Sequence, residues 1–131
     1  MEELNPITVK GTLRELLQKA VNVSPVMDGR TQLKTEDVLD KKLTIAAFDI
    51  VPGKDPKTGE EFSSPVFNFL EYPDKWYRGG SSLTHLVDAA VGHFGGDIDA
   101  ASDAVAADGI QIVLTMNRKR DGQPWVSVRV I

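Results

Sequence analysis

The stretch from Leu43 to Tyr72 constrains the fold more than any other part of the chain. Two apolar segments, 43–51 and 66–70, flank a loop that is dense in Pro, Gly, Asp and Lys. Such a loop composition is typical of turns and disfavours a helix. The stretch therefore predicts a β-hairpin with a lysine-bearing tip.

The first strand of this hairpin breaks the alternation that a regular strand requires. From Ile45 the inward positions should continue to Ala47, yet the large side chains that follow are Phe48 and Ile50. One extra residue at Ala46-Ala47 restores the pattern, which is what a β-bulge does. Because small barrels turn their corners with bulged and strongly bent strands, we expect a barrel or a strongly curved sheet.

Two helices are predicted after the hairpin. The first runs from Ser81 or Ser82 to about Phe94, because its apolar residues recur at helical spacing behind a serine that can act as N-cap. The second, over 98–108, is rich in alanine and is capped by Asp97. Together they form a helical insert.

The chain closes with a second predicted hairpin. Apolar and polar residues alternate over 110–117 and again over 125–131, and an Asp121-Gly122 turn signal lies between the two segments. Five strands result from the curved strand, its hairpin partner, this last hairpin and a third strand, which is either a short one near 75–79 or one supplied from elsewhere. We therefore expect an α+β fold with five antiparallel strands and the helical insert between strands 3 and 4.

The N-terminal residues 1–30 form a separate segment in this interpretation, and 31–131 form the folded domain. Thr12 and Glu15 are spaced as a capping box, and the apolar residues that follow share one helical face. They predict a short amphipathic helix over 12–21. This helix and the unprotected C-terminal edge strand each offer a surface through which a homo-oligomer could form, and the sequence leaves the oligomeric state open.

Composition excludes several classes of function. The 131 residues suffice for one domain, and the chain has no cysteine, which removes disulfides, thiolate catalysis and zinc–thiolate sites. His85 and His93 lie eight residues apart, about 12 Å along a helix, too far to share one metal ion unaided. No P-loop or catalytic-triad pattern occurs. We expect a protein that is not an enzyme and needs no metal or cofactor.

The distribution of charge matters more than its total. The net charge of −4 argues against coating nucleic acid by bulk charge, so binding would need basic residues gathered on one face. Basic residues gather in three places, two of which also hold aromatic residues, and single-stranded nucleic acid needs both cations for phosphates and rings for bases. The predicted binding residues are Lys54, Lys57, Lys75, Trp76, Tyr77, Arg78, Arg118, Lys119, Arg120 and Trp125. Solvated loop tips and a core role for the aromatic rings would explain the same residues.

The order of these elements resembles the oligonucleotide/oligosaccharide-binding (OB) barrel, in which a helix lies between the third and fourth strands. The stretches DVLDKKLTIAAFDIV, FNFLEYPDKWYRGGSSLTHLV and GIQIVLTMNRKRDGQPWVSVRVI also look like small proteins encoded by phages and mobile elements of Gram-positive bacteria. Some of these are regarded as single-stranded-DNA-binding or replication-associated. The resemblance covers roughly 31–131.

The leading functional hypothesis is a single-stranded-DNA-binding protein of a phage or mobile element. The alternative is a protein-interaction or structural module that uses the same fold without nucleic acid. No apolar run is long enough to span a bilayer and the N-terminus lacks a secretory pattern, so we expect no membrane association and a location in the cytoplasm of the bacterial host.

Overall fold

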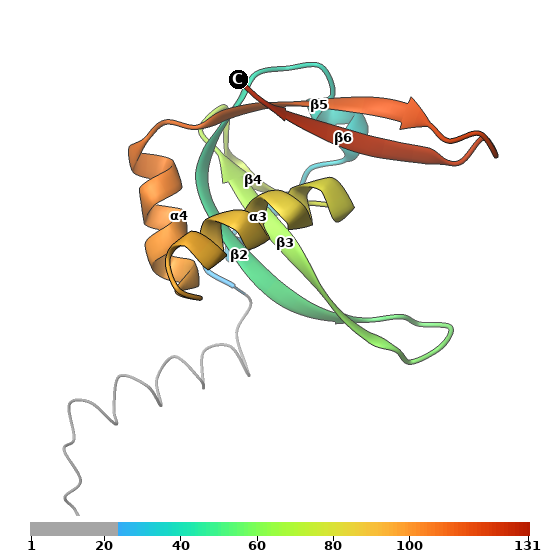
Figure 1. Ribbon diagram of the computed structural model, residues 1–131, viewed down its shortest axis with the longest axis horizontal. Coiled ribbons are helices and arrows are strands. Elements are labelled where there is room, and N and C mark those ends of the chain that lie inside the picture. The colour runs from blue at the N-terminus through green and yellow to red at the C-terminus, as the bar shows by residue number, and fades with distance from the viewer. Residues whose placement is uncertain (1–23) are drawn as a thin grey trace, which may run out of the picture.

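The computed structural model describes residues 24–131 as an α+β fold, in which a curled six-stranded mixed sheet forms a half-barrel with three helices (Figure 1). The helix predicted over 12–21 lies outside the described residues. The strands are β1 Thr31–Gln32, β2 Leu43–Lys54, β3 Glu61–Phe69, β4 Tyr72–Arg78, β5 Gln111–Arg118 and β6 Pro124–Val130. The helices are α2 Thr35–Val38, α3 Ser81–His93 and α4 Ile98–Ala107.

The strand order is β1-β4-β3-β2-β5-β6, and each neighbouring pair is antiparallel except β1 and β4. The expectation of five antiparallel strands is therefore wrong in number and in direction, because β1 adds a parallel edge by placing Thr31 beside Lys75. A strand of two residues is too short to leave an alternating pattern in the sequence. The helical insert consequently lies between β4 and β5.

The bulge predicted in β2 is confirmed. The register of β2 against β3 shifts between Ile45 and Ala47, so that Ile45 and Phe48 both face the core. Before the bulge β2 pairs with β5, where Leu43 lies opposite Ile112. After the bulge β2 pairs with β3 as far as its tip. One bent strand thus belongs to both halves of the sheet.

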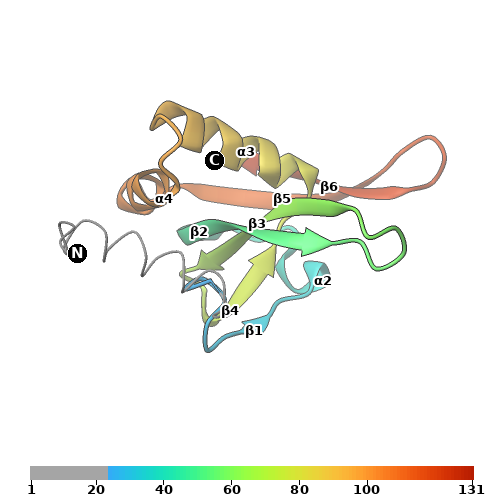
Figure 2. The same cartoon turned by 90° about the horizontal axis from the view of Figure 1, so that it is seen from below.

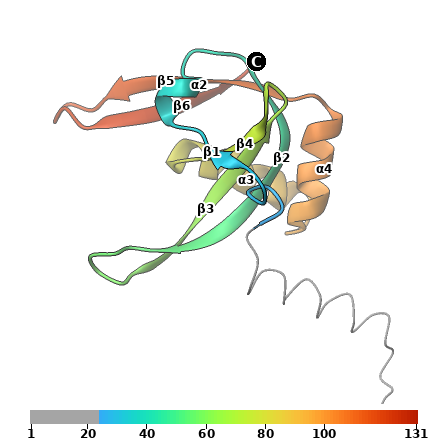
Figure 3. The ribbon, with the colours of Figure 1, turned by 180° about the vertical axis from the view of Figure 1, so that it is seen from behind.

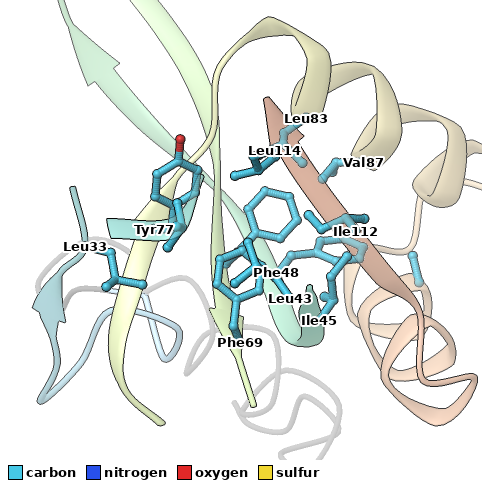
Figure 4. Close-up of a cluster of buried hydrophobic side chains, with 13 residues drawn as sticks. Leu33, Leu43, Ile45, Phe48, Phe69, Tyr77, Leu83, Val87, Ile112 and Leu114 are labelled. Carbon is cyan, nitrogen blue, oxygen red and sulfur yellow. The ribbon is translucent and has the colours of Figure 1, made fainter. Parts of the chain in front are cut away.

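The core fills the concave side of the half-barrel (Figure 4). Phe48 and Phe67 meet at 6.1 Å between ring centroids, and Phe67 stacks on Phe69 at 6.0 Å. Helix α3 adds Leu83 and Val87, both almost fully buried, and packs against β3 and β6. These contacts place α3 across the open side of the curled sheet, as Figure 2 shows from below.

The part of β2 beyond β5 has a free edge that is poorly suited to bind another strand. Phe48, Ile50 and Pro52 direct their backbone groups away from β3. The Phe48 N–H donates to the buried Ser102 hydroxyl of α4 at 3.0 Å, and the Ile50 N–H donates to the Asp49 carboxylate at 2.8 Å. Pro52 has no N–H at all. These three features disfavour pairing of this edge of β2 with a strand of another molecule.

Residues Ser24–Arg30, which we call the strap, cross the outer face of the sheet. Val26 is 5% exposed and packs with Val66 and Trp76 in a second hydrophobic cluster. The strap, which belongs to the predicted N-terminal segment 1–30, therefore packs on the sheet, and the division of the chain at residue 30 stays a prediction.

The close approach of α3 to β3 requires a glycine at position 79. A Cβ atom there would lie 2.8 Å from the Cβ of Leu83 and 3.2 Å from the Phe67 ring, whereas Gly80 has open space around it. We expect Gly79→Ala to lower the free energy of unfolding by about 1–3 kcal/mol, because α3 must shift to admit the methyl group. Urea denaturation measures the difference. Gly80→Ser, the control, should be neutral or slightly stabilising because serine is a good N-cap.

Glu71 ties the start of β2 to the turn between β3 and β4. Its carboxylate accepts hydrogen bonds from the Thr44 N–H and the Thr44 hydroxyl, both at 2.7 Å. Partial burial raises the pKa of Glu71, but the hydrogen bonds outweigh it and the pKa lies below its ordinary value. The charged Glu71 carboxylate therefore stabilises the fold fully at pH values above the pKa of an unfolded glutamate. This stabilisation is lost as the pH falls through the lowered pKa that Glu71 has in the folded protein.

We expect Glu71→Gln to lower the free energy of unfolding at neutral pH by about 0.5–1.5 kcal/mol, because the amide accepts these hydrogen bonds less strongly. Urea denaturation across a pH series measures this, and the difference from the parent chain should vanish in acid. Glu60→Gln, in the exposed β2–β3 loop, is the control and should have little effect. If Glu71→Gln lowered the free energy of unfolding by the same amount at every pH, the role of the charged carboxylate would be contradicted.

Candidate nucleic-acid interface

Two β-hairpins project from the same side of the molecule as separate arms (Figures 1 and 3). The β2–β3 arm ends in the loop 55–60 and the β5–β6 arm ends in the loop 119–123. The turn of the second arm is closed by a Gly122 N–H bond to the Lys119 carbonyl at 2.9 Å, with Gly122 at φ 87°. Both hairpins that the sequence predicts are therefore present.

The β5–β6 arm carries a concentrated positive charge. Arg118, Lys119 and Arg120 are all exposed at its tip. The only acid between 118 and 129 is Asp121, whose carboxylate accepts the Gln123 N–H at 3.0 Å and so helps to form the turn. By contrast, residues 79–117 contain five aspartates and no lysine or arginine. Charge is thus segregated along the chain.

Trp125 lies beside this cationic tip. It pairs across the strands with Asn117, next to Arg118, and its side chain is 39% exposed. Val126 and Val128 pack against the core, so the alternating positions Trp125 and Arg129 face outward. A half-exposed indole and several cations therefore occupy one arm.

The structure places Trp76 and Tyr77 in the interior, and not on the open surface that a base-stacking platform needs. Trp76 is 8% exposed beneath the strap and Tyr77 is 3% exposed in the main core. The Tyr77 hydroxyl also lies 3.1 Å from the Thr35 hydroxyl. Consecutive residues of a strand point to opposite faces, and both faces of β4 are covered here. Neither ring offers a free face in this arrangement.

The two basic residues around these rings have different surroundings. Lys75 is exposed beside Thr31 of β1. The guanidinium of Arg78 lies 5.5 Å from the centre of the Trp76 ring and donates to the Ser64 hydroxyl. The run 75–78 is therefore not one continuous basic patch.

The β2–β3 arm is not cationic overall. Residues 54–61 contain two lysines and three acids. Lys57 is exposed in the loop, and the side chain of Lys54 lies outside the described part of the structure. The predicted site residues are thus divided among two arm tips and strand β4, and among those that the structure describes only the β5–β6 group combines cations with an exposed ring.

Sequence reasoning missed Phe62, whose side chain is 48% exposed on the β2–β3 arm. Its ring covers Gly53 on the paired strand, where an added Cβ would lie 2.7 Å from the ring. A glycine opposite an aromatic residue in a hairpin is the signal that could have identified it. The open hollow beside the ring is lined by Pro52, Gly53, Glu61, Phe62 and Ser63.

Among residues 24–131, no helix has the length and apolar character needed to cross a membrane. Within the same range, the structure contains no group of three or more histidine, aspartate or glutamate side chains that could hold a metal ion. Comparison with protein-family models, curated proteins and solved structures finds no match to the chain.

The contrast between the two tryptophans can be measured with Trp76→Phe and Trp125→Phe, each of which leaves one indole. We expect the chain that retains Trp125 to emit at longer wavelength and to be quenched several-fold more strongly by acrylamide, because Trp125 is half exposed and Trp76 is covered. Equal quenching of the two variants would contradict the burial of Trp76.

Proposed function

We propose that this protein binds single-stranded DNA without catalysing a reaction, and that the β5–β6 arm is the main contact surface. The observation that carries the proposal is the group of Arg118, Lys119 and Arg120 beside the half-exposed Trp125. Cations that neutralise phosphates and a ring that stacks on bases are the two requirements of such a site.

The arrangement of the strands supports this proposal by analogy of fold. Apart from β1, the order β4-β3-β2-β5-β6 corresponds to an OB barrel that is open along one seam. OB folds bind oligonucleotides with the loops between strands 1 and 2 and between strands 4 and 5. The β2–β3 and β5–β6 loops occupy these positions. The proposed origin in a phage or mobile element rests only on the sequence resemblance.

The proposal requires affinity that depends on salt, because cations at the arm tip displace counterions from phosphates. Fluorescence anisotropy with labelled oligo-dT at low salt measures binding. For about three phosphate contacts we expect the logarithm of the affinity to fall with the logarithm of salt concentration at a slope near −2. The absence of binding at high micromolar protein would overturn the proposal.

Single substitutions separate the contribution of charge from that of the fold. Arg120→Gln should weaken binding to oligo-dT and reduce the salt slope by about 0.7, as expected for one lost phosphate contact. Lys42→Gln removes the same charge from an exposed residue before β2 and is the matched control. Equal effects of the two substitutions would indicate a response to net charge and not a site on the arm.

Trp125→Leu should weaken binding by about 1–3 kcal/mol if the indole stacks on a base. Phe62→Leu removes a comparably exposed ring from the other arm and is the matched control. A larger loss in Phe62→Leu would move the stacking surface to the β2–β3 arm.

A protein-interaction module is the second candidate, and the surroundings of Phe62 favour it. The exposed ring lies next to Glu61 and near Glu60, which would repel phosphates but suit a basic or apolar protein surface. Under this alternative, Arg120→Gln and Trp125→Leu would leave binding to the protein partner intact.

A further inference from the structure

The outer face of β3 and β4 is covered by the strap and not by solvent. Val26 at 5% exposure rests on Val66 at 0% and Trp76 at 8%, and the partly buried Met27 and Val51 extend the contact. This face lies on the opposite side of the sheet from the main core.

The covered face contains an aromatic ring paired with a cation. The guanidinium of Arg78 lies over Trp76 and is oriented by its hydrogen bond to Ser64. A stacking ring with an arginine fixed beside it is the combination that single-stranded nucleic acid uses. With the strap in place, the ring has no free face.

If the strap were released, the described polar side chains of the sheet beneath it would each keep a hydrogen-bond partner within the sheet. The Asn68 amide donates to the Val26 carbonyl at 2.7 Å, but it also lies 3.3 Å from the Lys75 carbonyl. Asp49 accepts the Ser24 hydroxyl at 2.6 Å, and its other oxygen retains the Ile50 N–H. Leaving a buried polar group without any hydrogen-bond partner raises the free energy, and release of the strap does not do so for these two side chains.

The strap backbone has two polar links to the sheet: the Val26 carbonyl accepts from Asn68, and the Arg30 guanidinium donates to both the Pro25 carbonyl and the Pro73 carbonyl of β4. Its turn bonds run from the Met27 and Asp28 N–H groups to the Ser24 carbonyl, and from Arg30 to Met27. Gly29, at φ 71° with open space around it, lies next to the point where β1 begins to pair with β4. The segment can therefore turn about Gly29 without breaking the β1–β4 ladder.

From this geometry we infer that the strap is a releasable cover over a second stacking face formed by Trp76 and Arg78. Single-stranded DNA that already holds the β5–β6 arm displaces the strap and stacks on Trp76. This inference rests on the proposed function and adds a conformational step to it: the fraction of molecules with the strap released limits the apparent affinity of the second face.

A disulfide can test the cover because the chain has no other cysteine. Ser24→Cys and Asp49→Cys replace side chains whose oxygen atoms lie 2.6 Å apart, and Trp125→Phe makes Trp76 the only indole. In the reduced triple variant, oligo-dT of about 30 nucleotides should quench Trp76 emission. Oxidation should abolish the quenching and weaken binding at least several-fold. The single variant Ser24→Cys, treated with the same oxidant, is the control.

Val26→Ser in the Trp125→Phe background weakens the contact of the strap with the sheet, whereas the disulfide locks that contact. Loss of the apolar contact should make Trp76 more accessible to acrylamide without DNA and should tighten binding of oligo-dT. Unchanged accessibility, or equal binding by the oxidised and reduced locked variants, would overturn the inference while the proposed function stands. If the parent chain binds no oligo-dT, the proposed function itself fails, and the acrylamide measurement still reports whether the strap opens.

Discussion

The structure depends on the single extra residue between Ile45 and Ala47. Because of it, Leu43 and Ile45 face the core opposite β5 and β3, and Phe48 faces the same core opposite Phe67. Without the bulge, Phe48 and Ile50 would turn to the strap side, and Val51 would turn to the core. The extra residue also bends β2, so that one strand leaves β5 and continues with β3.

The two arms are a consequence of this bend. Because β2 pairs with β5 only at Leu43 and Thr44 and continues along β3 as far as Lys54, the β2–β3 and β5–β6 hairpins diverge beyond the core. Each arm has exposed edges, and Pro52 and Pro124 stand at positions that direct backbone groups outward from them. Proline provides no N–H there. The arms can therefore extend into solvent and present their tips without inviting another strand.

The local pattern of the sequence was sufficient to predict both hairpins, the bulge and helices α3 and α4. It was not sufficient to predict what covers each face. Alternation shows that Trp76 and Tyr77 point to opposite sides of β4, but a strand with one solvated face and a strand buried on both faces can share that pattern. The strap, whose Val26 lies 42 residues before Asn68 in the chain, makes the difference. Its contact with the sheet leaves no periodic signal, and neither does the two-residue β1.

For the β5–β6 arm, the location of charge matters more than the net charge of −4. The acidic helix α4 and the cationic tip lie at opposite ends of the molecule in Figures 1 and 2. Exposed charges are screened over about 10 Å at 0.1 M salt, so a phosphate at the tip interacts mainly with Arg118, Lys119 and Arg120. The aspartates of α4 contribute little at that distance. A chain that is acidic overall can therefore attract a polyanion at one end. Under the proposed function, the same separation would orient single-stranded DNA toward the arm and away from the helices.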